Sequence, residues 1–235
     1  MTLPTKRTLV KSDPGGLVTL VYGAPKIGKS TLCSQAPSAL FLATEAGLNH
    51  LEVFQTPVSD WQNLLEICAE VKAGKHSFKT LVIDIIDNAY AMCLADVLKR
   101  HNLRHESDLP FGKGFTMVNR EFSRVINNIA LLGLGLIMVS HATEKEIEDE
   151  TGKKRSMIVP TLPSGARKIV MGISDLILYA ELEETKDEAG KPTGLRRVLR
   201  TKPSLRYEAG DRTGKLPETI DMSYAAIVAH LEDKK

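Results

Sequence analysis

Residues 23–31 read Gly-Ala-Pro-Lys-Ile-Gly-Lys-Ser-Thr and carry the most specific chemical pattern in the chain. They fit G-x-x-x-x-G-K-[ST], the P-loop, and they follow an apolar run at 17–22 that predicts a buried strand. Glycines at 23 and 28 permit backbone dihedrals that side chains forbid, so successive N–H groups can turn inward around phosphate oxygens. The segment therefore predicts a nucleoside triphosphate site at a helix N-terminus, which favours anions. The expected phosphate-binding residues are Gly23, Ala24, Pro25, Lys26, Ile27, Gly28, Lys29, Ser30 and Thr31.

Three side chains of this segment have expected roles with ATP and Mg²⁺. Lys29 is expected to neutralise β- and γ-phosphate charge, and the Ser30 hydroxyl to ligate Mg²⁺. Thr31 can add a hydrogen bond to the α-phosphate. The alternative is a glycine turn that only joins a strand to a helix. A P-loop requires a strand before the motif and a helix after it, and because both are expected here the phosphate-binding interpretation is favoured.

A second element is the apolar run 81–83, which ends in Asp84. A carboxylate at that strand end would lie beside the Mg²⁺. Many strands end in Asp, so this assignment depends on the P-loop. Asp87 is expected to cap the following helix rather than to contact a second metal ion.

Two further polar residues follow apolar runs. Glu45 comes after 39–43, where its carboxylate can polarise a water aimed at the γ-phosphate; the alternative is a solvated loop glutamate. His141 comes after 135–140, where it can hydrogen-bond the γ-phosphate and report its presence to the next loop. The alternative for His141 is an imidazole whose hydrogen bonds go to the backbone.

The elements that must position these residues alternate along the chain. Strands are expected at 17–22, 39–43, 80–86, 135–140, 175–180 and 195–201. Helices are expected at 61–71, 115–132 and 164–172, together with one that begins near 29, one that ends near 100 and one that begins near Ser223. This alternation predicts a three-layer α/β fold with a mostly parallel central sheet, whose ligands bind at the carboxyl ends of the strands. Polar turns near 142–160 and 184–194 predict an antiparallel hairpin extension at one edge.

The composition limits the classes of protein to which the chain can belong. Its 235 residues are 43% hydrophobic and 26% charged with a net charge of +2, so we expect an extended lead-in at 1–16 and one domain at 17–235. Cys33, Cys68 and Cys93 lack metal-ligand spacing and are expected to be buried thiols. No apolar run approaches about 20 residues, so we expect no membrane partner and a cytoplasmic protein.

Several segments together resemble the RecA-like ATPases, and most closely the compact phage RecA-like single-strand annealing and recombination proteins. The matching segments are GAPKIGKST, FLATEAG, TLVIDI, LIMVSHATEK and RTKPS with GDRTGKLPETI, which cover about 17–221. The resemblance implies a three-layer RecA-like fold, with Glu45 as the catalytic glutamate and His141 as the γ-phosphate sensor. It also implies that 102–114 and 142–165 are DNA-binding loops.

The resemblance further implies a homo-oligomer, a ring or a filament, with ATP between subunits. Arg200 and Lys202 then match basic residues that complete a neighbour's site, a contribution worth roughly 10³–10⁵ in rate. The alternative is two exposed strand-end charges. The additional domains of full-length cellular recombinases are not found in this sequence, so we expect annealing or strand binding, with a single-strand-binding protein as a further partner, rather than strand exchange.

Single-stranded DNA is the partner that the resemblance implies, and four residues are candidates to contact it. Lys113 and Phe111 can offer a cation and a ring to unstacked bases, unless the phenylalanine packs in the core. Arg167 and Lys168 are candidate phosphate contacts. Residues 191–215 carry eight basic and two acidic side chains, a further local excess of positive charge.

Two other functions remain open on the sequence. One is a RecA-like regulatory or helicase-loading ATPase that acts on protein partners instead of DNA. The acidic residues at 144–150 are a departure from the resemblance, because they are unlike a uniformly cationic DNA loop. The other is a small-molecule P-loop kinase, for which the basic residues 153–155 can serve as a lid.

Overall fold

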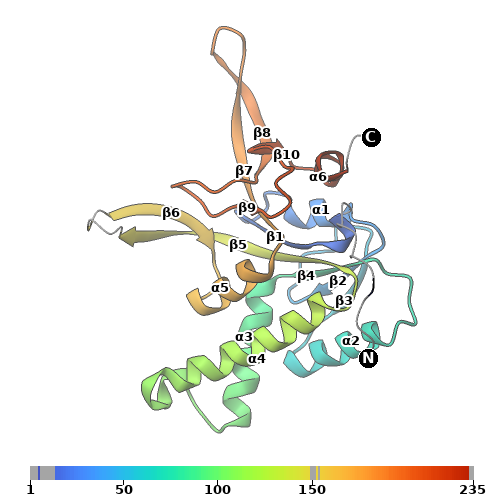
Figure 1. Cartoon of the computed structure of the whole chain (residues 1–235), viewed down its shortest axis with the longest axis vertical. Helices are drawn as coiled ribbons and strands as arrows, with labels where there is room; N and C mark the ends of the chain where they lie inside the picture. The colour runs from blue at the N-terminus through green and yellow to red at the C-terminus, as the bar shows by residue number, and fades with distance from the viewer. Residues whose placement is uncertain (1–4, 6–13, 149–151, 153, 233–235) are drawn as a thin grey trace.

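The computed structural model describes residues 5, 14–148, 152 and 154–232. The expected lead-in therefore lies mostly outside the described residues, as do Lys153 of the basic trio and 149–151 of the acidic arm. The described strands form one ten-stranded sheet with helices on both faces (Figure 1). The principal path through the sheet has the order β10-β8-β7-β1-β5-β4-β2-β3, while β6 pairs with β5 and β9 with β7.

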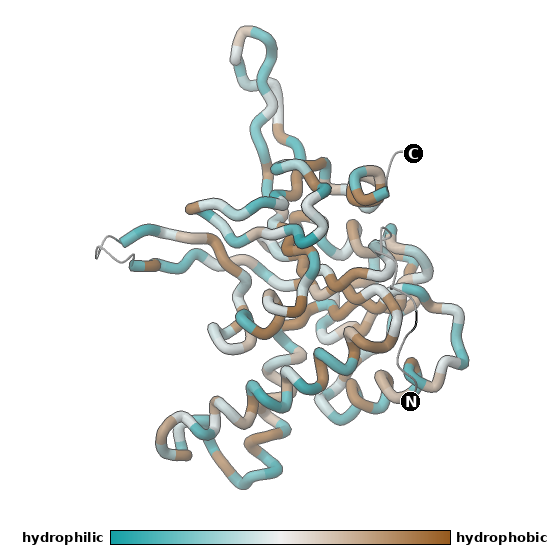
Figure 2. Tube along the Cα trace, in the orientation of Figure 1, coloured by the Kyte–Doolittle hydropathy of each residue, from teal (hydrophilic) through white to brown (hydrophobic). Residues whose placement is uncertain are grey.

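The centre of the sheet is parallel. Its strands, in spatial order, are β3 (Phe54–Pro57), β2 (Ala39–Ala43), β4 (Thr80–Asp84), β5 (Gly135–Glu148), β1 (Val18–Gly23) and β7 (Leu176–Lys186). Every neighbouring pair in this series is parallel. These strands are hydrophobic along most of their buried length (Figure 2), as expected for a sheet that is covered on both faces. The edge strand β3 was not predicted, because it is short, mostly exposed and has no apolar run.

Antiparallel strands extend this sheet. They are β8 (Pro192–Arg200), β9 (Gly210–Asp211), β10 (Thr219–Asp221) and β6 (Lys154–Pro160). The β7–β8 hairpin and the β5–β6 hairpin each project from the body as a long arm (Figure 1). The α/β fold with a mostly parallel sheet and an antiparallel extension at one edge is thus confirmed.

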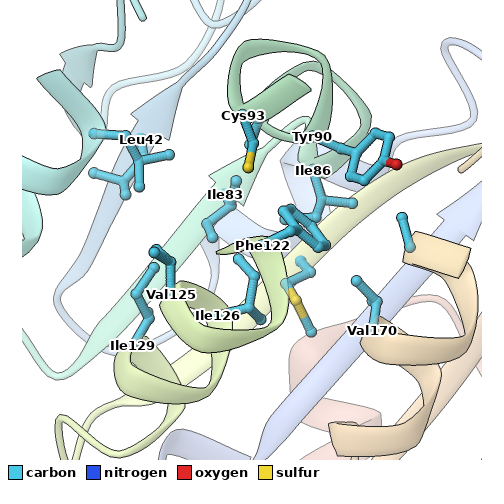
Figure 3. Close-up of a cluster of buried hydrophobic side chains, with 14 of the residues drawn as sticks. Leu42, Ile83, Ile86, Tyr90, Cys93, Phe122, Val125, Ile126, Ile129 and Val170 are labelled. Carbon is cyan, nitrogen blue, oxygen red and sulfur yellow. The ribbon is translucent and has the colours of Figure 1, made fainter. Parts of the chain in front are cut away.

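One face of the sheet is covered by a layer of long helices: α2 (Trp61–Lys72), α3 (Ile86–Arg100), α4 (Lys113–Ala130) and α5 (Ser164–Ile173). Figure 3 shows Phe122 and Ile126 of α4 in the cluster that also includes Ile83 of β4 and Tyr90 of α3. The helix α4 begins at Lys113, two residues before its predicted start. Short 3₁₀ turns at Glu106–Asp108 and Pro110–Gly112 precede it, in a region expected to be a plain loop.

The other face is covered by α1 (Lys29–Ser34) and α6 (Tyr224–Leu231), with a 3₁₀ turn at Pro14–Gly16. The α6 helix starts as predicted, because Ser223 accepts a hydrogen bond from the Ala226 amide at 3.1 Å. On the opposite face, Asp60 caps α2 by accepting from the Asn63 amide at 2.9 Å. The prediction that Asp87 caps α3 is wrong: the cap position is Ile85, which has no side-chain cap.

The cysteines are free thiols within helices. Cys33 and Cys93 are buried as predicted, whereas Cys68 is only half-buried. Burial raises the pKa of Cys68 to about 11 and that of Cys93 to about 12, so both thiols stay protonated and unreactive near neutral pH. Within the described part of the chain, no helix has the length and apolar character needed to cross a membrane.

Candidate active site

A cavity of about 610 Å³ opens at the carboxyl ends of the central strands. Parallel strands place these ends at one edge of the sheet, so residues far apart in the sequence meet there. The cavity is lined by Pro25, Lys26, Gly28, Lys29, Ser30, Thr31, Glu45, Gly47, Leu48, His50, Asp84, Ile85, His141 and Arg197.

The P-loop itself connects β1 to α1. Gly28 has φ 107°, a left-handed conformation that favours glycine, and Lys26 also has a positive φ of 63°. Gly23 has no positive φ, so the expected reason for its glycine is wrong. A Cβ at Gly23 would lie 2.5 Å from the carbonyl oxygen of Ala180 on β7, so close backbone packing requires glycine there.

Lys29 is buried within this loop. Its ammonium donates to the carbonyl oxygens of Gly23 at 3.0 Å and Ala24 at 2.9 Å, and lies 3.4 Å from Nδ1 of His141. Burial lowers the pKa of Lys29, and the nearby carboxylates, Asp84 foremost, oppose that shift. The ammonium is therefore fixed at the cavity wall beside the imidazole, where a terminal phosphate would meet both groups.

Ser30 and Asp84 have the chemistry of a magnesium site. The hydroxyl of Ser30, on α1, donates to Oδ2 of Asp84 at 2.8 Å. Burial raises the pKa of Asp84, and the hydrogen bond from Ser30 opposes this by favouring the carboxylate. Among the described residues no cluster of three or more His, Cys, Asp or Glu is placed to hold a metal. Two hard oxygen ligands fit Mg²⁺, which takes its other ligands from phosphates and water and neutralises phosphate charge when bound.

Glu45 lies on an exposed loop that nevertheless lines the cavity. The side-chain amide of Asn88, on α3, donates to Oε2 of Glu45 at 3.3 Å. Thr44 holds the start of the loop, since its hydroxyl donates to the Ile85 carbonyl at 2.8 Å and accepts from the Ile85 amide at 2.6 Å. The carboxylate is thus oriented by its neighbours, and Asn88 is a contact that the sequence analysis missed.

Asp87 lies in the first turn of α3, where its carboxylate is buried, and not at the N-cap of that helix. Both of its carboxylate oxygens are buried and have no hydrogen-bond partner among the described residues. Burial raises the pKa of Asp87, while the nearby Ser140 hydroxyl and His141 favour its charged form. The Ser140 hydroxyl donates instead to the carbonyl oxygen of His141 at 3.2 Å. Asp87 is therefore a buried carboxylate near His141 whose oxygens lack hydrogen bonds among the described residues.

The family of the chain follows from a comparison with known proteins. A family model described as "AAA domain" (AAA_24) matches residues 16–213, which include the whole P-loop and both acids of the site. The chain belongs to this AAA domain family. Membership makes it a P-loop ATPase domain and carries nucleotide binding with it.

Two individual proteins are similar to this AAA domain, both at less than 25% sequence identity. The SPbeta prophage-derived uncharacterized protein YorG of Bacillus subtilis (strain 168) is 23% identical over 185 residues. That match covers 75% of this chain and 54% of YorG, so the chain spans about half the length of this relative. The crystal structure of flagellar accessory protein FlaH from Methanocaldococcus jannaschii is 14% identical with a TM-score of 0.44, over 88% of this chain and 84% of that one.

Arg200 and Lys202 of this AAA domain do not line the cavity. Arg200 pairs with Glu181 at 2.5 Å and Glu183 at 3.0 Å, and Lys202 pairs with Asp211 at 3.2 Å. The alternative of two exposed charges is therefore wrong, since both cations are held in ion pairs within the chain. Their role in a neighbouring subunit stays a prediction.

The residues expected to contact DNA lie on three helical elements: the 3₁₀ turn Pro110–Gly112, α4 and α5. Phe111 is 98% exposed with φ 58°, so the alternative in which it packs in the core is wrong. Lys113 is exposed at the start of α4. On α5, Lys168 is exposed, while Arg167 lies 3.7 Å from the carboxylate of Glu208 and is mostly buried. Contact with DNA stays a prediction for all four.

Arg197 is the cavity residue that sequence analysis missed most clearly. It lies on β8 and reaches the P-loop, whereas its neighbour Arg196 pairs with Glu183 at 2.6 Å. Alternation along the strand puts the two arginines on opposite faces. Only the pairing of β8 with β7, and of β7 with β1, shows which one faces the site.

Proposed function

We propose that this AAA domain hydrolyses ATP with Mg²⁺ and couples hydrolysis to single-stranded DNA binding in phage recombination, most simply as a strand-annealing protein. The observation that carries the ATPase part is the convergence of Lys29, Ser30, Asp84 and Glu45 around one cavity. The prophage origin of YorG supports the phage setting.

The cavity residues divide the hydrolytic work. Lys29 binds the β- and γ-phosphates from the P-loop side, and the pair Ser30 and Asp84 holds the metal. Glu45, oriented by Asn88, accepts a proton from the attacking water. His141 hydrogen-bonds the γ-phosphate from within β5, opposite Gly23 and next to the ammonium of Lys29.

Coupling to DNA is supported by the continuity of β5. The strand continues from His141 to Glu148, and that distal part pairs with β6 to form the β5–β6 arm. A shift of His141 on loss of the γ-phosphate therefore acts on the arm without a flexible linker. The arm carries exposed cations at Lys145 and Lys154, although Lys154 pairs with Glu146 at 2.7 Å.

Stacking on bases is supported by Phe111. A fully exposed ring in a left-handed backbone conformation is unfavourable for a bulky residue in isolation, so a ligand for the ring is the simplest account of it. Lys113 adds a cation nearby in the sequence, which suits the phosphate backbone.

Assembly with ATP between subunits is part of the proposal. Arg200 and Lys202 would leave their ion pairs with Glu181 and Asp211 and bind the phosphates of a neighbour's ATP, which carry a higher negative charge. The ion pairs within the chain would then keep these cations ordered until a neighbour docks.

The test is an ATP hydrolysis assay with and without single-stranded DNA at several salt concentrations. We expect stimulation by DNA and DNA binding that weakens steeply as salt rises. The Glu45→Gln variant should bind DNA with ATP but show little turnover, and electron micrographs of the same mixtures report assembly.

A regulatory ATPase that acts on a protein is the second candidate, and the acidic side chains of the β5–β6 arm favour it. Glu144, Glu146 and Glu148 lie along one strand of that arm. ATP hydrolysis that is indifferent to DNA, together with no salt-sensitive DNA binding, would support this candidate over the recombination role. Stimulation by nucleosides would instead indicate a kinase.

A further inference from the structure

We propose that Arg197 forms the nucleoside side of the nucleotide site, with its guanidinium stacked on the purine ring of a nucleotide held by the same subunit. The inference rests on the proposed ATP binding and adds the part of the site that recognises the base. It concerns the wall of the cavity that Arg197 of β8 forms. In the sheet, β8 and the strands that carry the acids of the site lie on opposite sides of β1.

The strand order determines which end of a nucleotide reaches Arg197. Glu45 follows β2, Asp84 ends β4 and His141 lies within β5, and these three strands all lie on one side of β1 in the sheet. The strands β7 and β8 lie on the other side of β1. Because the P-loop extends from the end of β1, a triphosphate whose terminal phosphate meets the acids directs its nucleoside toward β8.

Arg197 is packed against the P-loop on that side. A Cβ added at Gly28 would lie 3.5 Å from Nη1 of Arg197 and 3.9 Å from Cζ. The guanidinium therefore lies beside Gly28, the N-cap residue of α1. Both Arg197 and Thr31, the expected α-phosphate contact, line the cavity.

The guanidinium of Arg197 is also uncommitted. Within the described residues it makes no hydrogen bond or ion pair, whereas Arg196 and Arg200 on the same strand pair with Glu183 and Glu181. A planar cation without a carboxylate partner is free to stack on an aromatic ring and loses little entropy in doing so.

The surroundings of Arg197 suit a flat apolar ligand. Leu182 lies directly opposite Arg197 in the β7–β8 register and is 52% exposed. A purine ring offers an apolar face, so Arg197 and Leu182 can cover it while the phosphates remain in the P-loop.

The experiment compares ADP with inorganic tripolyphosphate, which has phosphates but no nucleoside. Dissociation constants with Mg²⁺ are measured by calorimetry for the wild type, Arg197→Ala, Arg197→Lys and the control Arg196→Ala. We expect Arg197→Ala to weaken ADP binding about tenfold and to leave tripolyphosphate binding unchanged. Arg197→Lys should behave like Arg197→Ala, because an ammonium lacks the planar face. Arg196→Ala should match the wild type.

The outcomes separate this inference from the proposed function on which it rests. A wild type that binds neither ligand overturns the ATPase assignment and this inference together. A wild type that binds both ligands while Arg197→Ala binds ADP equally well overturns the inference alone. Equal weakening of ADP and tripolyphosphate, or full rescue by lysine, also overturns it, because Arg197 would then be a phosphate contact. Far-ultraviolet circular dichroism checks that each variant is folded.

Discussion

The hydroxyl of Ser30 donates a hydrogen bond to Oδ2 of Asp84 across 2.8 Å, which joins the start of α1 to the end of β4. The two residues are 54 positions apart, and β5 lies between their strands β1 and β4 in the sheet. The carboxyl ends of parallel strands share one edge, so this contact follows from the fold and brings two oxygen ligands together at the phosphate-binding turn.

Replacing Lys29 with alanine should abolish tight nucleotide binding. Its buried ammonium is held at the cavity wall by the Gly23 and Ala24 carbonyls, and charge-assisted bonds to phosphate would be lost. We expect a loss of about 3 kcal/mol, or about a hundredfold in the dissociation constant of ATP, measured by calorimetry. Lys72→Ala, on the exposed side of α2, is the matched control. Unchanged affinity in Lys29→Ala would contradict the site.

Replacing Glu45 with glutamine should keep ATP binding and slow hydrolysis by about 10²–10⁴-fold, because the amide cannot accept the proton of the attacking water. Asn88→Ala should give a smaller loss, since it only orients the carboxylate. Phosphate release measured in single turnover separates chemistry from binding. Glu52→Gln, also exposed, serves as the control. If Glu45→Gln turns over at the wild-type rate, Glu45 is a solvated loop residue.

Replacing Asp87 with asparagine should stabilise the fold at neutral pH by about 1 kcal/mol, because its buried carboxylate oxygens lack hydrogen bonds. The folded pKa of Asp87 is raised, so the native state binds the proton more tightly than the unfolded chain. Its charge therefore costs stability as pH rises from about 4 through the raised pKa. Urea unfolding at several pH values should show the gain above this window and little difference near pH 4. An equal gain at every pH would exclude titration as the cause.

Replacing Asp211 with alanine should destabilise the fold by about 3 kcal/mol. Its side chain is fully buried and accepts hydrogen bonds from the Thr213 amide at 2.8 Å, the Leu216 amide at 2.9 Å and Lys202 at 3.2 Å. Burial alone would raise the pKa of Asp211, but these hydrogen bonds outweigh it and the pKa is lowered. The stabilisation is therefore present above the unfolded pKa of about 4 and is lost as pH falls through the folded value. Thermal unfolding of Asp211→Ala at neutral and acidic pH measures both effects; a melting temperature like that of the wild type would contradict them.

Replacing Lys202 with alanine should lower ATP hydrolysis only in the assembled protein. Its cost in stability should be small, because its ammonium is partly exposed and Asp211 keeps its other donors. Turnover is compared at protein concentrations above and below assembly, as judged by light scattering. The same fractional loss in both states would show that Lys202 does not act on a neighbour.

The elements were largely predictable because their signals are local. An apolar run followed by a glycine turn and a helix is specified by neighbouring residues, and the helices expected at 61–71 and from Ser223 begin beside their caps Asp60 and Ser223. The strand β3 was missed because its four mostly exposed side chains carry no burial pattern. The start of α4 was placed two residues late, because Gly112 rather than a polar cap precedes it.

The sequence by itself determined the P-loop, the positions of Glu45 and Asp84 at the ends of their strands, and the alternation that makes a parallel sheet. Each of these depends on backbone preferences and side-chain polarity within a few residues. The prediction that a strand ends before His141 is wrong, because β5 continues through it to Glu148. Only the tertiary structure decided that Ala180 requires a glycine at 23, that Asp87 is a buried carboxylate, and that Arg197 rather than Arg196 faces the cavity. The contact of Ala180 with Gly23 and the orientation of Arg197 depend on strand register across β1, β7 and β8, where a shift of one residue would turn every side chain to the other face. The burial of the Asp87 carboxylate depends on how α3 packs on the sheet.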